Sequence, residues 1–465
     1  MVTFSTLDIL IIIFFFFSVI AVGYWAGKKE QRSADDYLLS GRKVSLTLFV
    51  LTNVATWYGG ILGVGEFTYR YGLLAWFTQG LPYYIFALLF ALFFAKKIRL
   101  ASLFTIPDKI SEVYGRKAGL ISAVLVFVLV SPAPYVLMTG NLISIIFGTG
   151  MLFSLIISVI LSAAYLFKGG FRSDVYTDVI QFFVMFAGFI LIFFIASAKF
   201  GGLEFLSANL PSDHLKFTGG ASPVFIIVWF LIALWTFADP RFHQRCYAAK
   251  DGSTAMKGII ISIFFWILFD FLTTSTGLYA KALLPGLAQP VLAYPLLAEK
   301  ILSSGLKGFF YAALFATIMS TLNSFLFLSA TTIGRDFIFR IKKFNNEDRL
   351  KSYAVYGLII SAAVSVALAW AMPSVIEIWY TVGSFCIPGI ILPVISSYYF
   401  KIRISKMIML IEMISAVSIS MAWYFLRNEI EGSILYEVEP MIAGLFTASV
   451  IHCYGIISRY VNPKS

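Results

Sequence analysis

The lysine and arginine residues of this chain fall almost entirely into alternate connections between its hydrophobic segments. Of 35 basic residues, 28 lie in every second connection and in the C-terminal tail, and the other seven lie elsewhere. Basic residues beside membrane spans stay on the cytoplasmic side, so the alternation predicts a chain that crosses a bilayer many times, with its N-terminus outside and its C-terminus inside. The basic connections are 28–43, 96–118, 168–175, 241–257, 334–352 and 401–406.

The hydrophobic pattern predicts about 13 transmembrane helices, since a span needs about 20 apolar residues. The segments lie roughly at 7–27, 44–65, 73–95, 119–147, 150–167, 176–198, 223–240, 256–280, 308–333, 353–372, 377–400, 406–426 and 440–458. A composition of 60% hydrophobic and 13% charged residues agrees with this. We expect an all-α polytopic protein of the plasma membrane, a single domain over 1–465 in contact with lipid. The net charge of +11 sits in short loops, so it indicates topology and not nucleic-acid binding.

The second segment contains a polar, glycine-rich stretch, Asn53-Val-Ala-Thr-Trp-Tyr-Gly-Gly-Ile-Leu-Gly-Val-Gly65. Thr56 lies about 18 Å from the start of the segment at the rise of an α-helix, which is near the bilayer midplane. A helix break is one interpretation of this stretch. The other is a small-residue packing face at Gly59 and Gly63.

The seventh segment has a matching feature, Leu234-Trp-Thr-Phe-Ala-Asp-Pro-Arg-Phe-His-Gln-Arg245. Pro240 disrupts a helix interior but suits the first position of a new helix, and Asp239 before it suits the N-cap. We expect a helix that stops near Trp235 and restarts at Pro240, with Asp239 either as the cap or as a direct ligand.

Two broken helices five segments apart indicate an inverted-repeat secondary transporter, in which unwound backbone lines the binding site. We expect a five-plus-five core, with the first repeat at 44–199 and the second at 223–400. The helices at 1–27 and 406–458 would then be peripheral. The stretch 290–302 has helical spacing and is expected to form a short outer helix, either a lid or a surface element.

The ninth segment carries four hydroxyl residues on one helical face. Thr317, Ser320, Thr321 and Ser324 follow the spacing i, i+3, i+4 and i+7. Ser320 is expected about 18 Å deep, level with Thr56. Uncharged oxygen ligands suit sodium, although hydroxyl groups in membrane helices also bond simply to backbone carbonyls.

Several motifs together resemble the sodium/solute symporter family. They are Ala316-Thr-Ile-Met-Ser-Thr-Leu-Asn-Ser324, Gly169-Gly-Phe-Arg-Ser-Asp-Val-Tyr-Thr-Asp-Val-Ile-Gln181, Asp239-Pro-Arg-Phe-His-Gln-Arg245 and Gly41-Arg42. The resemblance implies symport of sodium with a small organic solute. It also implies that sodium binds the backbone carbonyls of Asn53, Thr56 and Thr317 and the hydroxyls of Ser320 and Thr321, and that Asp178 lies on the cytoplasmic ion exit.

The solute site is expected between the two breaks. Its predicted walls are Trp57, Tyr58, Gln79, Trp235, Phe237 and Asp270. Ala55 stands where the proline carriers of the resembled family have an aspartate, and Gly59-Gly60 where the sugar carriers have Glu-Gln. The resemblance therefore implies neither a proline nor a sugar substrate.

Asp270 is surrounded by apolar residues in the eighth segment, where a carboxylate at mid-membrane costs about 2.5 to 3.5 kcal/mol. It has either a substrate or coupling role or a structural hydrogen bond with a neighbouring Ser or Thr.

Alternating-access symport with sodium as the coupling ion is the leading functional hypothesis. A transporter-like sensor or receptor that binds solute without moving it is the alternative. The sequence has no HExxH or GxSxG motif and no metal-ligand spacing, so neither an enzyme nor another cofactor is expected.

Overall fold

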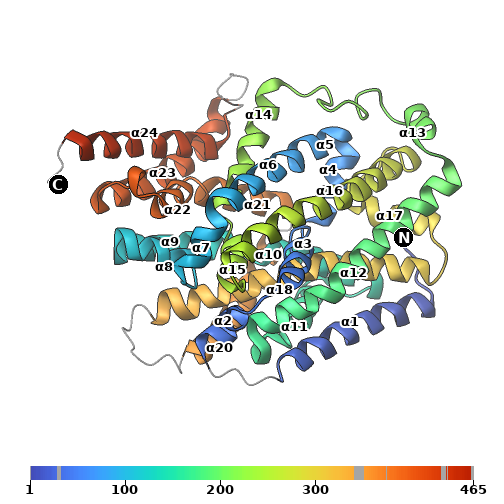
Figure 1. The fold of residues 1–465 in the computed structure, drawn as a ribbon. Helices are drawn as coiled ribbons and strands as arrows, with labels where there is room; N and C mark the ends of the chain where they lie inside the picture. Colours follow the sequence, from blue (N-terminus) through green and yellow to red (C-terminus); the bar gives the residue numbers. More distant parts are fainter. Residues whose placement is uncertain are drawn as a thin grey trace.

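The protein is a bundle of helices whose two termini lie at opposite ends (Figure 1). The computed structural model describes residues 2–28, 33–339, 350–372, 374–430, 436 and 438–461. Parts of two predicted basic connections, 29–32 and 340–349, lie outside the described residues. Helices dominate the described residues, and the β-structure found among them is an isolated bridge between Val44 and Ala249. The all-α fold class is confirmed.

Within the described residues, nine helical stretches are long and apolar enough to cross a membrane, and ten if one bent pair counts as a span. They are α1 (Thr6–Ala26), α9 with α10 (Arg116–Leu129, Ala133–Phe147), α12 (Leu166–Phe200), α14 to α15 (Pro223–Ile232, Pro240–Ala248), α16 (Gly252–Leu283), α18 with its continuation η5 (Leu306–Thr331, Thr332–Phe339), α20 (Leu350–Ala371), α23 (Lys406–Leu426) and α24 (Pro440–Val461). The bent pair is α21 (Val375–Cys386) with α22 (Ile391–Tyr398). The chain is therefore a multi-pass membrane protein.

Three predicted segments fall on shorter helical pieces. The segment 44–65 forms α3 (Leu46–Ala55) and α4 (Ile61–Tyr71). The segment 73–95 forms α5 (Leu73–Gln79), α6 (Leu81–Phe90) and η2 (Ala91–Ala95), and α7 (Lys96–Ala101) follows it. The segment 150–167 forms α11 (Met151–Ala163). The count of about 13 spans, the inverted repeat and the division into two halves with peripheral helices stay predictions.

The connections carry short helices. These are α2 (Ala34–Leu39), η1 (Ser40–Arg42), α8 (Ile106–Tyr114), α13 (Leu203–Asn209), η4 (Pro290–Leu292), α17 (Ala293–Ile301), η7 (Phe400–Ile402) and η8 (Arg427–Ile430). The short helix predicted over 290–302 is confirmed as η4 and α17. Tyr294 of α17 lies against Gly65 of α4, where an added methyl group would meet its ring at 2.7 Å, so α17 packs tightly on the bundle.

Hydrogen bonds sort the connections into two groups. One group joins four basic connections: Arg42 with Leu103 (3.1 Å), Arg99 with Ala249 (2.6 Å) and Thr105 with Asp336 (2.9 Å). The other joins the weakly basic connections: Thr3 with Glu299 (2.8 Å), Tyr69 with Leu284 (2.6 Å) and Tyr279 with Gly201 (2.6 Å). The basic connections therefore lie beside one another, and so do the weakly basic connections, as the charge pattern predicts.

Helix α18 is the centre of the bundle, because every residue of its hydrophobic window is buried inside the protein. Helices α1 and α12 pack beside it (Figure 1). The outer face of α1 presents Leu10, Phe14 and Phe17, all more than half exposed, which suits contact with lipid tails. The site described below lies on the buried side of α18.

A carboxylate of α1 holds the start of α18. Asp8 accepts hydrogen bonds from the backbone N–H groups of Gly305 and Gly308, both at 2.8 Å, and from the N–H and hydroxyl of Ser5. The first N–H groups of a helix have no partner within it. Asp8 therefore caps the central helix from a neighbouring one.

We predict that Asp8→Ala destabilises the protein by about 1–3 kcal/mol, because it leaves buried N–H groups of α18 without an acceptor. The measurement is the melting temperature of the purified protein in detergent. Asp213→Ala is the control, since Asp213 pairs with Lys216 on the exposed surface. Equal melting temperatures for wild type and Asp8→Ala would show that α18 does not depend on this cap.

Candidate functional site

The first break lies between α3 and α4. Helix α3 ends at Ala55, Thr56 follows as its C-cap, and α4 begins at Ile61. The last carbonyl groups of a helix lack partners within it. The interruption predicted at this point is confirmed, and it leaves carbonyl oxygens pointing into the buried centre of the protein.

The second break lies between α14 and α15. Helix α14 ends at Ile232, residues Ala233–Ala238 form the tighter 3₁₀ helix η3, and α15 begins at Pro240. Asp239 caps α15, because its carboxylate accepts the N–H of Arg241 at 2.9 Å. The predicted cap is confirmed, and the cap also forms a buried ion pair with the Arg241 side chain.

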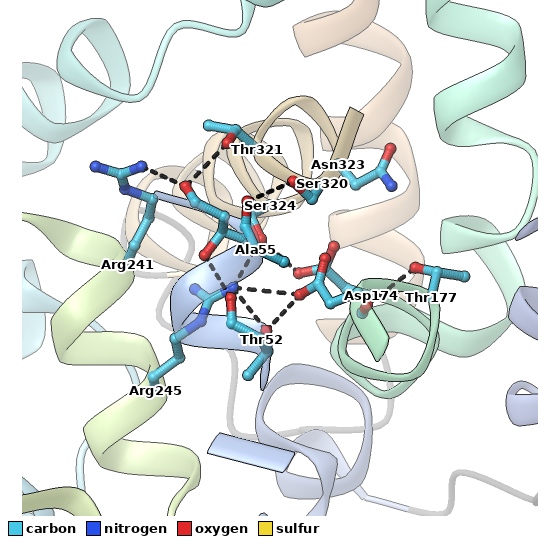
Figure 2. A network of polar contacts seen from close by, with 12 residues as sticks. Thr52, Ala55, Asp174, Thr177, Arg241, Arg245, Ser320, Thr321, Asn323 and Ser324 are labelled. Atoms are coloured by element: carbon cyan, nitrogen blue, oxygen red, sulfur yellow. Dashed lines mark hydrogen bonds and ion pairs between the residues drawn. The ribbon is translucent and has the colours of Figure 1, made fainter. Parts of the chain in front are cut away.

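Hydroxyl groups of α18 meet the carbonyls of the first break (Figure 2). Ser320 donates to the carbonyl of Ala55 at 2.7 Å and to that of Thr317 at 3.1 Å. Thr321 donates to the carbonyl of Thr56 at 2.9 Å. Of the five predicted sodium ligands, the structure thus gathers Thr56, Thr317, Ser320 and Thr321. Asn53 lies in the last turn of α3, and its carbonyl stays a predicted ligand.

Gly59 permits this close approach of α18 to the break. A methyl group on Gly59 would lie 2.3 Å from the side chain of Thr321, far inside van der Waals contact. Gly60 and Gly63 instead face the ring of Trp379, at 2.3 and 3.0 Å from an added methyl group. The predicted break is therefore present, whereas Gly59 and Gly63 do not share one packing face, because Gly59 packs on α18 and Gly63 on Trp379 of α21.

A buried guanidinium connects the two breaks. Arg241 pairs with Asp239 through its Nη2 at 2.6 Å and donates through Nη1 to the carbonyl of Thr56 at 2.7 Å. Its guanidinium lies 5.3 Å from the ring centre of Trp57 and 5.0 Å from that of Phe325. The same carbonyl that Thr321 contacts is therefore also a partner of Arg241.

A second buried arginine, Arg245, connects side chains of α3, α18 and α12. Arg245 donates to the hydroxyls of Thr52 (2.9 Å) and Ser324 (3.1 Å) and lies 3.6 Å from a carboxylate oxygen of Asp178. Thr52 also donates a hydrogen bond to Asp178. Ser324 donates to Asp174 at 2.6 Å, so it belongs to this cluster and not to the carbonyls of the break.

Two predictions need correction here. Asp178 was expected where the sixth span begins, just inside the cytoplasmic connection. Helix α12 instead begins at Leu166 and bends at Gly170, so Asp178 lies within the bundle and is fully buried. Arg241 and Arg245 were counted among the charges of a cytoplasmic connection, but α15 carries both into the buried core. Their ion pairs compensate a charge that would be costly at that depth.

The sequence analysis missed four members of this site: Thr52, Asp174, Arg241 and Arg245. Arg241 and Arg245 lie within six residues of Asp239, so the expected helix restart was itself the available signal. Extending α15 by helical geometry from Pro240 places both arginines about one to two turns into a buried helix. The contacts of Asp174 with α18 had no comparable signal in the sequence.

The aromatic residues among the predicted walls of the solute site pack against different neighbours. Trp57 stacks on Trp266 with ring centres 4.8 Å apart, and Tyr58 packs on Phe269 at 4.5 Å. Phe237 packs on the aromatic rings of α6 and η2, Phe86, Phe90 and Phe94. Trp235 is half-buried in η3.

Asp270 forms a polar cluster with two tyrosines. It accepts a hydrogen bond from Tyr84, and Trp76 donates to the same tyrosine oxygen at 3.2 Å. Tyr58 approaches the same carboxylate and donates to the carbonyl of Trp266 at 2.8 Å. Gln79 lies one residue before the point where α5 passes this carboxylate, and its buried Nε2 has no hydrogen-bond partner. Tyrosine hydroxyls, and not the expected Ser or Thr, therefore satisfy Asp270.

The sodium:solute symporter family matches residues 37–402, which is most of the chain. The chain belongs to this family. The high-affinity choline transporter 1 of Caenorhabditis elegans is 25% identical over 80% of this chain and 70% of its own. The sodium/glucose cotransporter of Vibrio parahaemolyticus is 26% identical over 71% and 68%. The sodium/pantothenate symporter of Escherichia coli is 30% identical over 48% of each chain.

Solved structures show the same fold. A Na⁺-coupled sialic acid symporter superposes with a TM-score of 0.84 over 99% of this chain and 98% of its own, at 16% identity. A transporter of the nucleobase–cation symport family superposes with a TM-score of 0.62 over 93% and 96%, at 12% identity. The predicted function, sodium-coupled symport of a small organic solute, is confirmed at the level of the family.

We predict that Gly59→Ala raises the sodium concentration needed for half-maximal stabilisation or uptake, because the new methyl group displaces the Thr321 hydroxyl. A change of about tenfold corresponds to the loss of one ligand contact worth about 1.4 kcal/mol. Gly150→Ala is the control, since no atom lies within 4 Å of an added methyl group there. An unchanged sodium midpoint in Gly59→Ala would separate Thr321 from ion binding.

Proposed function

We propose that sodium binds between α3 and α18, at the carbonyls of Asn53, Thr56 and Thr317 and the hydroxyls of Ser320 and Thr321. The contact of the α18 hydroxyls with the carbonyls of the first break carries this proposal. Neutral oxygen atoms suit a monovalent cation, and unwound backbone at this depth needs such partners. Sodium binding there joins α3 to α18 and orders the first break.

The solute site adjoins the ion site. We propose that Trp57 and Tyr58 from the first break and Trp235 and Phe237 from the second form its aromatic walls. Gln79 lies toward the outer side, where its free amide suits a polar group of the solute. Asp270 acts on this site through Tyr58, whose hydroxyl it approaches. Ligand sites of this kind combine many apolar contacts with few polar groups.

Asp178 is proposed as the next anchor for sodium on the way to the cytoplasm. It lies on α12 beside Thr52 of α3, on the cytoplasmic side of the break, and its second carboxylate oxygen has no hydrogen-bond partner. A free carboxylate oxygen attracts a cation that leaves the carbonyl site. In this proposal the end of the bundle with the basic connections faces the cytoplasm, the protein lies in the plasma membrane, and the N-terminus is outside.

Sodium entry supplies enough free energy for solute uptake. One positive charge moving inward releases about 2.3 kcal/mol at 100 mV. A tenfold sodium gradient adds about 1.4 kcal/mol. Together these support roughly a few hundredfold accumulation of a neutral solute. Uptake into vesicles that contain only this protein, with sodium or potassium outside, tests transport directly, because a sensor binds solute without accumulating it.

We predict that Ser320→Ala and Thr321→Ala each raise the sodium midpoint roughly tenfold or more, since each removes an oxygen ligand. Ser324→Ala, one turn along the same helix, changes the midpoint less, because Ser324 contacts Asp174 and Arg245 instead. Thermal stabilisation by sodium at constant ionic strength measures all three variants. Equal midpoints in wild type, Ser320→Ala and Thr321→Ala would move the ion away from α18.

The two buried carboxylates are expected to respond differently to neutralisation. Asp178→Asn slows turnover more than it weakens equilibrium sodium binding, because it removes the exit anchor and not a ligand of the site. Asp270→Asn alters solute affinity or selectivity, because it removes the negative charge that Tyr58 and Tyr84 face beside the solute site. Sodium-binding curves and uptake kinetics for both variants make the comparison. Unchanged turnover in the first, or unchanged solute selectivity in the second, contradicts the corresponding role.

A further inference from the structure

Arg241 lies where the ion site and the solute site meet. Its backbone belongs to the first turn of α15, and its side chain reaches across to the first break. The residue is only 8% exposed, and two aromatic rings, those of Trp57 and Phe325, flank its guanidinium. These rings offer the guanidinium no conventional hydrogen-bond acceptor, so its N–H groups need polar partners from elsewhere.

The carbonyl of Thr56 has no lone pair left for sodium in this conformation. A carbonyl oxygen accepts through two lone pairs. Thr321 donates to the oxygen at 2.9 Å and Arg241 at 2.7 Å. A sodium ion that takes this oxygen as a ligand must displace one of the two donors. Arg241 is the donor with the positive charge, so it competes with sodium both for the ligand and by repulsion.

The guanidinium retains donors for another acceptor. It has five N–H groups. Asp239 accepts from Nε and Nη2, and Thr56 accepts from Nη1. The remaining N–H groups on Nη1 and Nη2 form the second edge of the fork, whose geometry matches a carboxylate. A carboxylate at this edge attracts the guanidinium more strongly than the neutral Thr56 carbonyl does, so a shift of the guanidinium toward it lengthens the contact between Nη1 and Thr56.

Charge balance favours an anionic solute. Asp239 and Arg241 form a neutral pair in the buried core. Sodium adds one positive charge, which is costly at this depth unless it is compensated. Beside Arg241, a carboxylate of the solute is attracted by both the guanidinium and sodium, whereas a cationic group is repelled by both.

We propose that Arg241 binds a carboxylate group of the transported solute, and that this contact releases the Thr56 carbonyl for sodium. The inference rests on the proposed sodium site and adds to it the class of solute and the link between the two ligands. Solute and sodium then promote each other's binding, because each favours the conformation in which Arg241 has left Thr56.

The first test needs no knowledge of the solute. Sodium is titrated against purified protein at constant ionic strength, with potassium replacing sodium, and the melting temperature is recorded. Arg241→Gln should lower the sodium midpoint about fivefold or more, the lower range of typical coupling between sites. The variant Asp239→Asn/Arg241→Gln should do the same. It removes both charges of the pair, and Asn keeps the N-cap of α15.

The double variant separates two explanations. In Arg241→Gln, the unpaired Asp239 charge could by itself attract sodium and lower the sodium midpoint. If that were the whole cause, the midpoint would return to the wild-type value in the double variant. Such a result would contradict the competition between Arg241 and sodium at Thr56. Arg70→Gln is the matched control, because Arg70 pairs with Glu66 on α4 and is half exposed. It should leave the sodium midpoint unchanged.

The second test addresses the solute. Acetate, propionate, benzoate and pantothenate are each compared with the corresponding primary amide, and choline serves as a cationic probe. At least one carboxylate should lower the sodium midpoint of the wild type, its amide should not, and the effect should disappear in Arg241→Gln. Equal effects of acid and amide, no effect of any carboxylate, or an effect that survives Arg241→Gln overturns the proposed recognition.

The outcomes distinguish this inference from the proposed function. One outcome is that sodium stabilises the wild type, while Ser320→Ala abolishes the stabilisation and Arg241→Gln leaves it unchanged. In that case only the proposed role of Arg241 is wrong. If sodium has no effect on the wild type and Ser320→Ala changes nothing, the ion site itself is wrong.

Discussion

The unpaired backbone at the end of α3 is the constraint on which the rest of this site depends. A helix that stops in the middle of a membrane leaves carbonyls that water cannot reach, and each needs a partner from within the protein. Ser320 and Thr321 supply these partners, and they do so from the most deeply buried helix of the bundle. Gly59 makes the approach possible, because a larger residue would push Thr321 away.

Buried charged side chains, like the unpaired carbonyls, need partners within the protein. Asp178 lies 3.6 Å from Arg245 beside Thr52, and Asp239 forms an ion pair with Arg241 at the second break. Both arginines come from α15, so the short helix that restarts after Asp239 places one guanidinium at the Thr56 carbonyl and the other beside Thr52, about one turn earlier in the chain. Removing one member of such a pair leaves a buried charge without compensation. Movement of α15 relative to α3 would therefore rearrange both pairs together.

Local signals in the sequence predicted local structure well. Asp239 before Pro240 predicted a helix start, because capping depends on adjacent residues, and the structure has that cap. The spacing of Thr317, Ser320, Thr321 and Ser324 predicted a shared face, but periodicity does not say what lies opposite. The structure separates Ser324, which contacts Asp174 and Arg245, from Ser320 and Thr321, which contact the break. Arg241 was assigned to a loop because charge counting treats basic residues beside a span as exposed. Its carboxylate partner, Asp239, was interpreted as a cap or a ligand and not as the partner of an arginine.

An anionic solute changes the energetics of transport. When one sodium ion accompanies one monoanion, no net charge crosses the membrane, so the membrane potential of about 2.3 kcal/mol per charge at 100 mV adds nothing. A tenfold sodium gradient then supplies about 1.4 kcal/mol, enough for roughly tenfold accumulation. Greater accumulation of such a solute requires a second sodium ion for each transport cycle. The charge on the solute bound at Arg241 therefore determines how many ions the cycle must move, and a measured current during uptake reports that number.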